Sequence, residues 1–476
     1  MENTWRTGFQ TQREELHEVE LDVEGTFPEW LTGTFLSNGP GQFEVGRTPL
    51  THWFDALAMV RRIRIDHDTV RYTNRFIQSD DFRVAREEHR VRRSLPGTPA
   101  DGSAFRRLYQ TVTGAFQDNA AIGVVALDST VYAVTESPIG FEIDIDTLHT
   151  TGRRDLTAGM DSDVTLGHTH IEDGVQWGLA ASFGNTCTYT LFRRGPGSSP
   201  DPISRLLFDN HPPYIHAFAV TEQYAIVPEA PFGVDFRRLF LESPRGGTFL
   251  DAFAPRETTP RFHVFDRMTG EQIAAVRADP FFIYHFANAY EADDNTLVVD
   301  CVTFPDATAI TGLTLANLRS ASPDLPHGDF VRFRLPLRGG SAQRELLLRG
   351  PCEFPTIHYN RYNGRRYRYA YLATTDYGSL PTAIAKVAVD GPMTRRWSEP
   401  GLHPGEAIFV PAPSPTAEDD GVLLSLALDG RAERSVLLCL DAETLTERAR
   451  APLPHRLPYG FHGQFYAGTD RTRSMA

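Results

Sequence analysis

The feature that most constrains the fold is a hairpin pattern that occurs several times along the chain. An apolar run ends in Asp, a Thr follows three residues later, and a second, polar-edged run comes next. Three copies begin at residues 141, 262 and 437: FEIDIDTLHTTGRRDL, FHVFDRMTGEQIAAVRA and LLCLDAETLTERARAPL. Asp and Thr side chains hydrogen-bond nearby backbone N–H groups in turns, so each copy predicts two antiparallel strands joined by a tight loop.

Further strand signals lie between these hairpins. Runs rich in β-branched and aromatic residues, bounded by turn-forming residues, occupy 123–137, 175–184, 217–230, 295–304, 366–375 and 421–430. Groups of four such strands are typical of the blades of a β-propeller, which closes into a ring and protects its sheet edges. About seven blades of roughly 40–50 residues, with long loops, would occupy the 476 residues. An array of β-sandwiches would give a similar pattern.

Helical periodicity is scarce, and no linker divides the chain. Only 83–94 and 311–320 indicate short helices. The Pro- and Gly-rich clusters at 193–202 and 410–421 are short enough to be surface loops. The sequence therefore predicts an all-β protein in which residues 1–476 form a single domain.

Composition excludes some classes of protein and disfavours others. Hydrophobic residues make up 41% of the chain, which excludes a disordered polypeptide, and the net charge of −14 without a basic block argues against nucleic-acid binding. Four widely separated cysteines favour free thiols in a reducing compartment. We find no apolar signal peptide and no run long enough to span a bilayer, so a cytoplasmic location is expected.

Four of the 16 histidines share an unusual setting. His168, His216, His285 and His462 each lie among apolar or small residues at the edge of a predicted strand. Any one of them could be a hydrogen-bonded core histidine, but four buried imidazoles can be satisfied together by one metal ion. Their wide separation in sequence would place them on different blades, which meet at a propeller axis. Such a ligand set suits iron, copper or zinc, and spacing does not choose among these metals.

Three glutamates are candidate partners of these histidines. Glu136, Glu353 and Glu406 lie in the apolar segments YAVTESP, PCEFPTI and GEAIFVP, where the alternative is a partly exposed loop glutamate. A histidine that binds a metal usually donates its second ring N–H to a carboxylate or a similar acceptor. The three glutamates would then orient the metal-binding rings.

Taken together, these motifs resemble the carotenoid cleavage oxygenase family, which includes carotenoid oxygenases, stilbene-cleaving dioxygenases and the retinal pigment epithelium retinoid isomerase. The resemblance runs from LTGTFLSNGPGQFE (31–44) and THWFDALAMV (51–60) to YGFHGQF (459–465). It implies a seven-bladed propeller whose long loops form a cap over an axial site with one Fe(II) per chain. The implied ligands are His168, His216, His285 and His462. Glu136, Glu353 and Glu406 are implied to orient three of these rings.

Some positions depart from the family pattern. Ser37, Ala56 and Thr169 stand where the family usually has Arg, Gly and Pro. None of the three is an implied ligand, so the departures concern local loop geometry. His170, which follows His168 by two residues, is expected not to bind the metal.

The resemblance also implies an enzyme. It would be a non-haem Fe(II) dioxygenase that cleaves a C=C bond of a carotenoid or apocarotenoid with O2, giving aldehyde or ketone products. The segments YAVTES and HTHIEDG are similar to the animal branch, which makes central cleavage to retinal a hypothesis. A stilbene-type alkene dioxygenase and a retinoid isomerohydrolase are alternatives on the same fold, and a non-enzymatic scaffold is a third. Stilbene cleavers usually carry Lys before the first of the three glutamates, where this chain has Thr135.

A polyene substrate requires an apolar tunnel and access to a bilayer. The segment 231–255 mixes Phe and Leu with Arg and is predicted to make a peripheral membrane contact, although a loop folded over the propeller is the alternative. The expected partners are O2 and a hydrophobic polyene. The aromatic residues available for a tunnel are Trp53, Phe54, Phe141, Trp177, Phe218, Phe232, Phe286 and Phe354.

Overall fold

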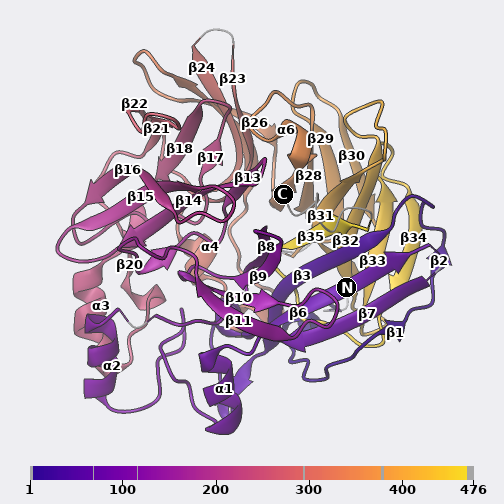
Figure 1. Cartoon of the computed structure of the whole chain (residues 1–476), viewed down its shortest axis with the longest axis horizontal. Coiled ribbons are helices and arrows are strands. Elements are labelled where there is room, and N and C mark those ends of the chain that lie inside the picture. The colour runs from indigo at the N-terminus through magenta and orange to yellow at the C-terminus, as the bar shows by residue number, and fades with distance from the viewer. Residues whose placement is uncertain (1–3, 68, 115, 293–294, 377–379, 469–476) are drawn as a thin grey trace.

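Seven antiparallel sheets of four or five strands surround a common axis (Figure 1). The computed structural model describes residues 4–67, 69–114, 116–292, 295–376 and 380–468. The chain therefore folds as a seven-bladed β-propeller, which confirms the predicted fold class.

Five of the blades are built from consecutive segments, each running from an inner strand to an outer one. The second comprises β8 (Gly123–Leu127), β9 (Thr130–Val134), β10 (Ile139–Ile143) and β11 (Thr150–Asp155). The third comprises β12 (Val164–Thr165), β13 (His170–Glu172), β14 (Val175–Ser182), β15 (Cys187–Arg194) and β16 (Asp201–Phe208). The fourth comprises β17 (Ala219–Val220), β18 (Tyr224–Glu229), β21 (Arg261–Asp266) and β22 (Gln272–Arg277). The fifth comprises β23 (Phe282–Glu291), β24 (Thr296–Phe304), β25 (Asp329–Pro336) and β26 (Gln343–Leu348). The sixth comprises β27 (Cys352–Thr356), β28 (Tyr369–Thr374), β29 (Ala383–Ala388) and β30 (Thr394–Ser398).

The first and seventh blades each combine strands from both ends of the chain. The first has the order β1 (Val19–Glu20), β7 (Thr69–Phe76), β6 (Leu57–Asp66), β3 (Gly33–Gln42) and β35 (Gly463–Ala467). The seventh has the order β2 (Glu24–Gly25), β34 (Glu447–Pro452), β33 (Arg434–Asp441), β32 (Gly421–Asp429) and β31 (Leu402–Pro411). Because β35 pairs with β3 and β2 pairs with β34, the ring is closed twice.

The repeated Asp-x-x-Thr turns have the predicted role. Asp266 and Asp441 end the third strand of their blades, Asp144 directly follows the third strand of its blade, and each begins the turn to the fourth. In each turn one carboxylate oxygen accepts hydrogen bonds from the backbone N–H groups two and three residues later. The same side chain therefore satisfies the same backbone donors in three different blades.

Short helices and two-stranded ribbons lie in the loops between strands. The helices are α1 (Asp80–Glu87), α2 (Ala104–Val112), α3 (Phe236–Glu242), α4 (Thr308–Thr311), α5 (Leu315–Leu318) and α6 (Tyr359–Tyr362). The ribbons pair β4 (Glu44–Val45) with β5 (Thr48–Pro49) and β19 (Phe232–Val234) with β20 (Phe253–Pro255). In the described part of the chain, no helix is both long and apolar enough to cross a bilayer.

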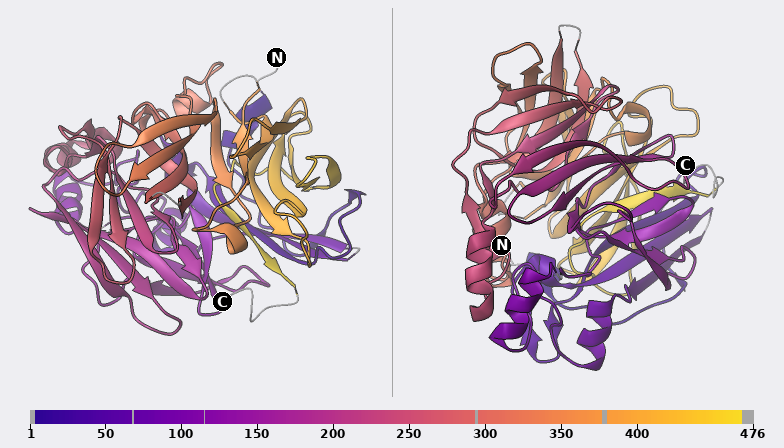
Figure 2. Two further views of the ribbon diagram at one scale, coloured as in Figure 1. Left: turned by 90° about the horizontal axis from the view of Figure 1, so that it is seen from above. Right: turned by 60° about the vertical axis from the view of Figure 1, so that its left-hand side comes forward.

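Three of these helices, α1, α2 and α3, gather at one end of the molecule (Figures 1 and 2). The helix predicted at 83–94 overlaps α1. The sequence does not predict α2 or α3. Each of the three begins at a side-chain cap, since Ser79, Ser103 and Asp235 accept hydrogen bonds from backbone N–H groups of the first turn. The short length of α2 and α3 explains why hydrophobic periodicity missed them.

A buried ion pair connects the fifth and sixth blades. Arg332 in β25 donates two hydrogen bonds to Asp300 in β24, at 2.8 and 2.7 Å, and one to the carbonyl oxygen of Val389 beyond β29. Tyr367 donates a further hydrogen bond to Asp300 at 2.8 Å. Because Asp300 is fully buried, its charge depends on these partners.

We predict that Asp300→Ala lowers the free energy of unfolding by about 3–5 kcal/mol, because it leaves the Arg332 guanidinium buried without its counter-charge. Chemical denaturation measures this change. The control is Asp279→Ala, an exposed carboxylate between β22 and β23, which should shift the value by no more than about 0.5 kcal/mol. Equal values for the two variants would contradict the structural role of the pair.

Candidate metal centre

The structure brings together the four histidines selected from the sequence. His285 lies in β23, and the other three lie one to three residues before the inner strands β13, β17 and β35. One potential ligand atom from each of the four lies within 4.8 Å of the others. The centroid of the His168 ring lies 4.9 Å from the ring centroids of His216 and His285 and 4.3 Å from that of His462. Inner-strand segments of four blades thus meet at one point.

Each of the three predicted glutamates contacts one of these rings. Glu136 accepts a hydrogen bond from Nδ1 of His216 at 2.6 Å. Glu353 contacts Nδ1 of His285 at 2.6 Å, and Glu406 contacts Nδ1 of His462 at 3.0 Å. A carboxylate on Nδ1 keeps the proton there and directs the lone pair of Nε2 away from it, toward the common point.

The fourth ring, that of His168, has no such carboxylate among the described residues. Its Nε2 atom is buried and has no hydrogen-bond partner there, and the same is true of Nε2 of His285. Buried polar atoms are normally hydrogen-bonded, so these two orphaned nitrogens require another partner. A metal ion between the four rings fits both atoms.

Irregular strand pairing affects the direction of the side chains of His285, Glu353 and Glu406. The register between neighbouring strands shifts around His285 in β23, after Glu353 in β27 and around Glu406 in β31. Such bulges turn a side chain away from the alternation of a regular strand. Beside Glu353, Phe354 has a φ of +53°, a conformation that is uncommon for a residue with a side chain. Its ring stacks on His285 at 5.5 Å.

The electrostatic environment favours neutral imidazoles. Burial lowers the pKa of His168 well below the usual value, and the neighbouring imidazoles lower it further. Burial and the same kind of neighbours lower the pKa of His285. Both rings are therefore neutral near pH 7, which is the form that binds metal ions. Burial also raises the pKa of the Glu353 carboxyl to about 7.

His170 lies outside this cluster although it is only two residues from His168. Its Nδ1 contacts the hydroxyl of Tyr359 at 2.9 Å, and its Nε2 donates to the carbonyl oxygen of Phe218 at 3.0 Å. Both ring nitrogens therefore have partners within the protein, which explains why this ring is free of the central cluster.

Tyr214 is a residue of the centre that the sequence did not single out. Its hydroxyl donates a hydrogen bond to Oε1 of Glu136 at 2.8 Å, and the same carboxylate oxygen accepts the hydrogen bond from His216. Burial and the nearby carboxylate raise the pKa of Tyr214 well above its usual value, so the hydroxyl remains a donor. Its position two residues before His216 is the only sequence signal that could have identified it.

An apolar cavity of about 170 Å³ lies between Glu136, which contacts His216, and the helices α2 and α3. Glu136 and Tyr214 line one part, and Gln110 of α2 and Leu239 of α3 line another. Its aromatic lining is Phe116, Phe183, Tyr189, Tyr214, Phe236 and Phe249. None of the eight aromatic residues proposed from the sequence lines this cavity, because facing a cavity depends on loops that strand patterns do not describe. Phe141 and Phe218, for example, are buried in packing clusters.

Comparisons with known proteins point to one family. The family described as "Retinal pigment epithelial membrane protein" matches residues 9–467. The carotenoid isomerooxygenase of Galleria mellonella is 32% identical over 94% of this chain and 93% of its own. The beta,beta-carotene 15,15'-dioxygenase of Mus musculus is 29% identical over 97% of this chain and 91% of its own. Cobalt-substituted Synechocystis ACO, an apocarotenoid oxygenase, superposes with a TM-score of 0.87 at 24% identity over 98% of each chain, which supports the fold.

We predict that the protein binds one ferrous ion per chain under anaerobic conditions and that His285→Ala abolishes this binding. The substitution removes one of the converging nitrogens and leaves Glu353 without its donor. Metal content after desalting, measured by mass spectrometry, gives the stoichiometry. His170→Ala is the matched control and should keep the ion. A full equivalent in His285→Ala, at the affinity of the unmodified protein, would contradict the ligand assignment.

Proposed function

This chain belongs to the retinal pigment epithelial membrane protein family, and from that premise we propose that it is a non-haem Fe(II) dioxygenase acting on carotenoids or apocarotenoids. The proposed reaction cleaves one C=C bond with O2, and each oxygen atom ends in one carbonyl product. One observation carries the proposal: four imidazoles converge beside an apolar cavity that is lined by Glu136, the hydrogen-bond partner of His216. This set of neutral nitrogen ligands suits iron.

When bound, iron would supply the one-electron chemistry with O2 that protein side chains lack. The chain's own residues perform the remaining tasks. Glu136, Glu353 and Glu406 hold the Nδ1 protons of three rings and fix their orientation. The aromatic cavity walls bind the polyene and exclude water. Holding a double bond beside the centre converts an encounter in solution into an effectively unimolecular reaction.

A long polyene is the proposed class of substrate. The named activities of the similar proteins, a carotenoid isomerooxygenase and a β-carotene dioxygenase, support this choice and keep central cleavage to retinal as a hypothesis. Stilbene cleavage is disfavoured because the residue before Glu136 is Thr135. The only lysine, Lys386, is buried in β29, where it pairs with Asp419.

A retinoid isomerohydrolase remains the second candidate, because the matching family is described by a retinal pigment epithelial protein and the Galleria relative is named an isomerooxygenase. Dependence on O2 separates the two functions. We expect iron-loaded protein under ¹⁸O2 to convert a carotenoid or apocarotenal into two carbonyl products, each with one labelled oxygen. Conversion of a retinyl ester without O2 would establish the second candidate. Intact substrates across carotenoids, apocarotenals and stilbenes would refute the cleavage proposal.

We predict that Glu353→Gln keeps most of the iron but lowers the cleavage rate by about 10–100-fold. The amide can still accept from His285, but it no longer carries the charge that makes this ring a strong ligand. Turnover and metal content are measured on the same preparation. Glu443→Gln, at an exposed turn, is the control. An unchanged rate in Glu353→Gln would remove this residue from the catalytic site.

We further propose that the protein meets a membrane at α2 and α3, since polyenes reside in bilayers and the cavity reaches both helices. The contact differs from the one expected from 231–255 alone. In that segment Phe240 and Leu241 are exposed by 47% and 62%, whereas Leu239 and Phe253 are buried. The larger exposed apolar surface is on α2, where Phe105, Tyr109 and Val112 are exposed by 61–76%.

Replacing Phe105 and Leu241 together by Ser should weaken vesicle binding by at least tenfold. Burying one side chain of this size contributes about 1.5–3 kcal/mol to the free energy of membrane binding, so replacing two of them removes most of the apolar contact. Flotation with phosphatidylcholine vesicles measures the change. Met268→Ser is the control because Met268 is 70% exposed on the turn between β21 and β22. Wild-type binding by the double variant would refute this contact surface.

A further inference from the structure

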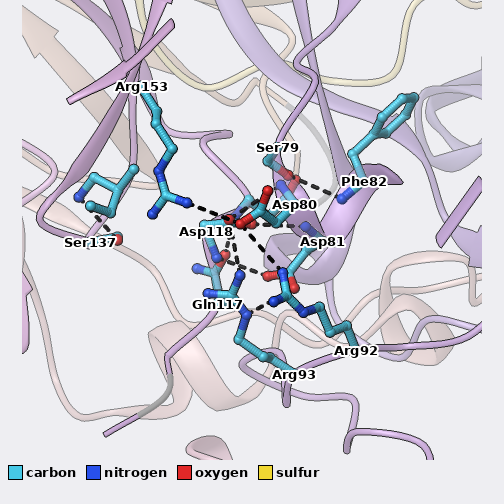
Figure 3. Close-up of polar contacts among 12 residues, drawn as sticks. Ser79, Asp80, Asp81, Phe82, Arg92, Arg93, Gln117, Asp118, Ser137 and Arg153 are labelled. Carbon is cyan, nitrogen blue, oxygen red and sulfur yellow. Dashed lines mark hydrogen bonds and ion pairs between the residues drawn. The ribbon is translucent and has the colours of Figure 1, made fainter. Parts of the chain in front are cut away.

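An arginine-lined pocket lies next to α2, outside the metal centre. It is open to solvent, has a volume of about 620 Å³ and is lined by Asp80, Arg92, Arg93, Arg106, Tyr109, Gln110 and Arg153. Figure 3 shows how Arg92, Arg93 and Arg153 approach the carboxylates at the start of α1. Four guanidinium groups and one carboxylate thus line the same pocket, although the chain carries a net charge of −14.

Asp80, the one carboxylate in the lining, does not neutralise Arg92, Arg106 and Arg153. Asp80 is shared by three guanidinium groups: those of Arg153 at 3.0 Å, Arg92 at 3.5 Å and Arg83 at 3.8 Å. Within the described residues, Arg106 has no carboxylate at ion-pair distance, and its guanidinium donates only to the carbonyl oxygen of Arg92 at 3.4 Å. The pocket therefore has an excess of positive charge that is available to an anionic ligand.

Arg93 has a different role from the other three, because it is held by two buried carboxylates. It contacts Asp81 at 3.1 Å and Asp118 at 3.0 Å. Each of these aspartates also accepts a hydrogen bond from the backbone N–H of the other, at 2.9 and 3.0 Å. This cluster ties α1 to the segment before β8 and so makes one wall of the pocket rigid. Arg92, Arg106 and Arg153 remain to meet a ligand.

The pocket adjoins the proposed membrane contact. Phe105, Tyr109 and Val112 follow one another at helical spacing along the exposed side of α2, and Tyr109 also lines the pocket. Gln110 lines both this pocket and the apolar cavity that Glu136 also lines. Exposed apolar residues beside arginines are typical of a surface that lies at the boundary of lipid headgroups and acyl chains.

We propose that this pocket binds the phosphate group of an acidic phospholipid in the bilayer that α2 and α3 contact; the proposal rests on the membrane contact of the proposed function. Guanidinium groups bind phosphate oxygens through paired, charge-assisted hydrogen bonds. An acidic bilayer repels the rest of this negatively charged protein and attracts the pocket. The mouth of the cavity would thereby be turned toward the lipid that holds the substrate.

The test compares vesicles of phosphatidylcholine alone with vesicles that also contain phosphatidylglycerol, at constant ionic strength. The unmodified full-length protein should bind the mixed vesicles more tightly. In Arg106→Gln/Arg153→Gln this preference should fall by about 25-fold, because each arginine near an anionic surface contributes roughly a fivefold effect. Arg395→Gln, an exposed arginine in β30 of the sixth blade, is the matched control and should keep the preference.

A second variant, Arg106→Glu, covers the case in which replacing Arg153 disturbs Asp80 and the start of α1. It leaves every ion pair of Asp80 in place and should also abolish the preference. Equal binding of the unmodified protein to both vesicle types would overturn the phosphate proposal while leaving the apolar contact standing. A preference retained in both variants would overturn the assignment to this pocket. Binding of soluble glycerol 3-phosphate, without a preference among vesicles, would also overturn it. Flotation requires no turnover, so these outcomes are independent of the cleavage reaction.

Discussion

The hydrogen bond from an imidazole Nδ1 to a partly buried glutamate is the interaction on which this site depends. It occurs three times, in the pairs His216–Glu136, His285–Glu353 and His462–Glu406. Each bond fixes the proton on one ring nitrogen and leaves the other nitrogen available toward the axis. Without it, the rings could rotate and the converging arrangement would be lost.

The propeller makes this arrangement accessible from remote parts of the sequence. Inner strands of all blades run close to one axis, so a residue at the end of each can reach the same point. Regular strands would alternate their side chains between two faces, and the register shifts in β23, β27 and β31 change that alternation where the site residues lie. Closure of the ring by β35 also positions His462, which immediately precedes this strand. Closure of the ring therefore places one of the four histidines at the axis.

The sequence predicted those parts that depend on local pattern. The hairpins, the fold class and the grouping of histidines with glutamates follow from turn chemistry, strand composition and motif resemblance. It did not predict α2 or α3, because helices of nine and seven residues are too short for periodicity to distinguish them from loop sequence. The cavity lining and Tyr214 were also missed, since side-chain directions in loops are set by tertiary packing. The segment 231–255 was selected for its composition, yet only part of its apolar surface is exposed.

The most direct test of the central claim is anomalous diffraction at the iron absorption edge from crystals grown and loaded with Fe(II) without oxygen. The account predicts one anomalous peak per chain, within bonding distance of a nitrogen from each of His168, His216, His285 and His462, with the three glutamates on the far sides of their rings. A peak bound to a carboxylate, a peak elsewhere on the protein, or four rings turned away from an empty centre would contradict it.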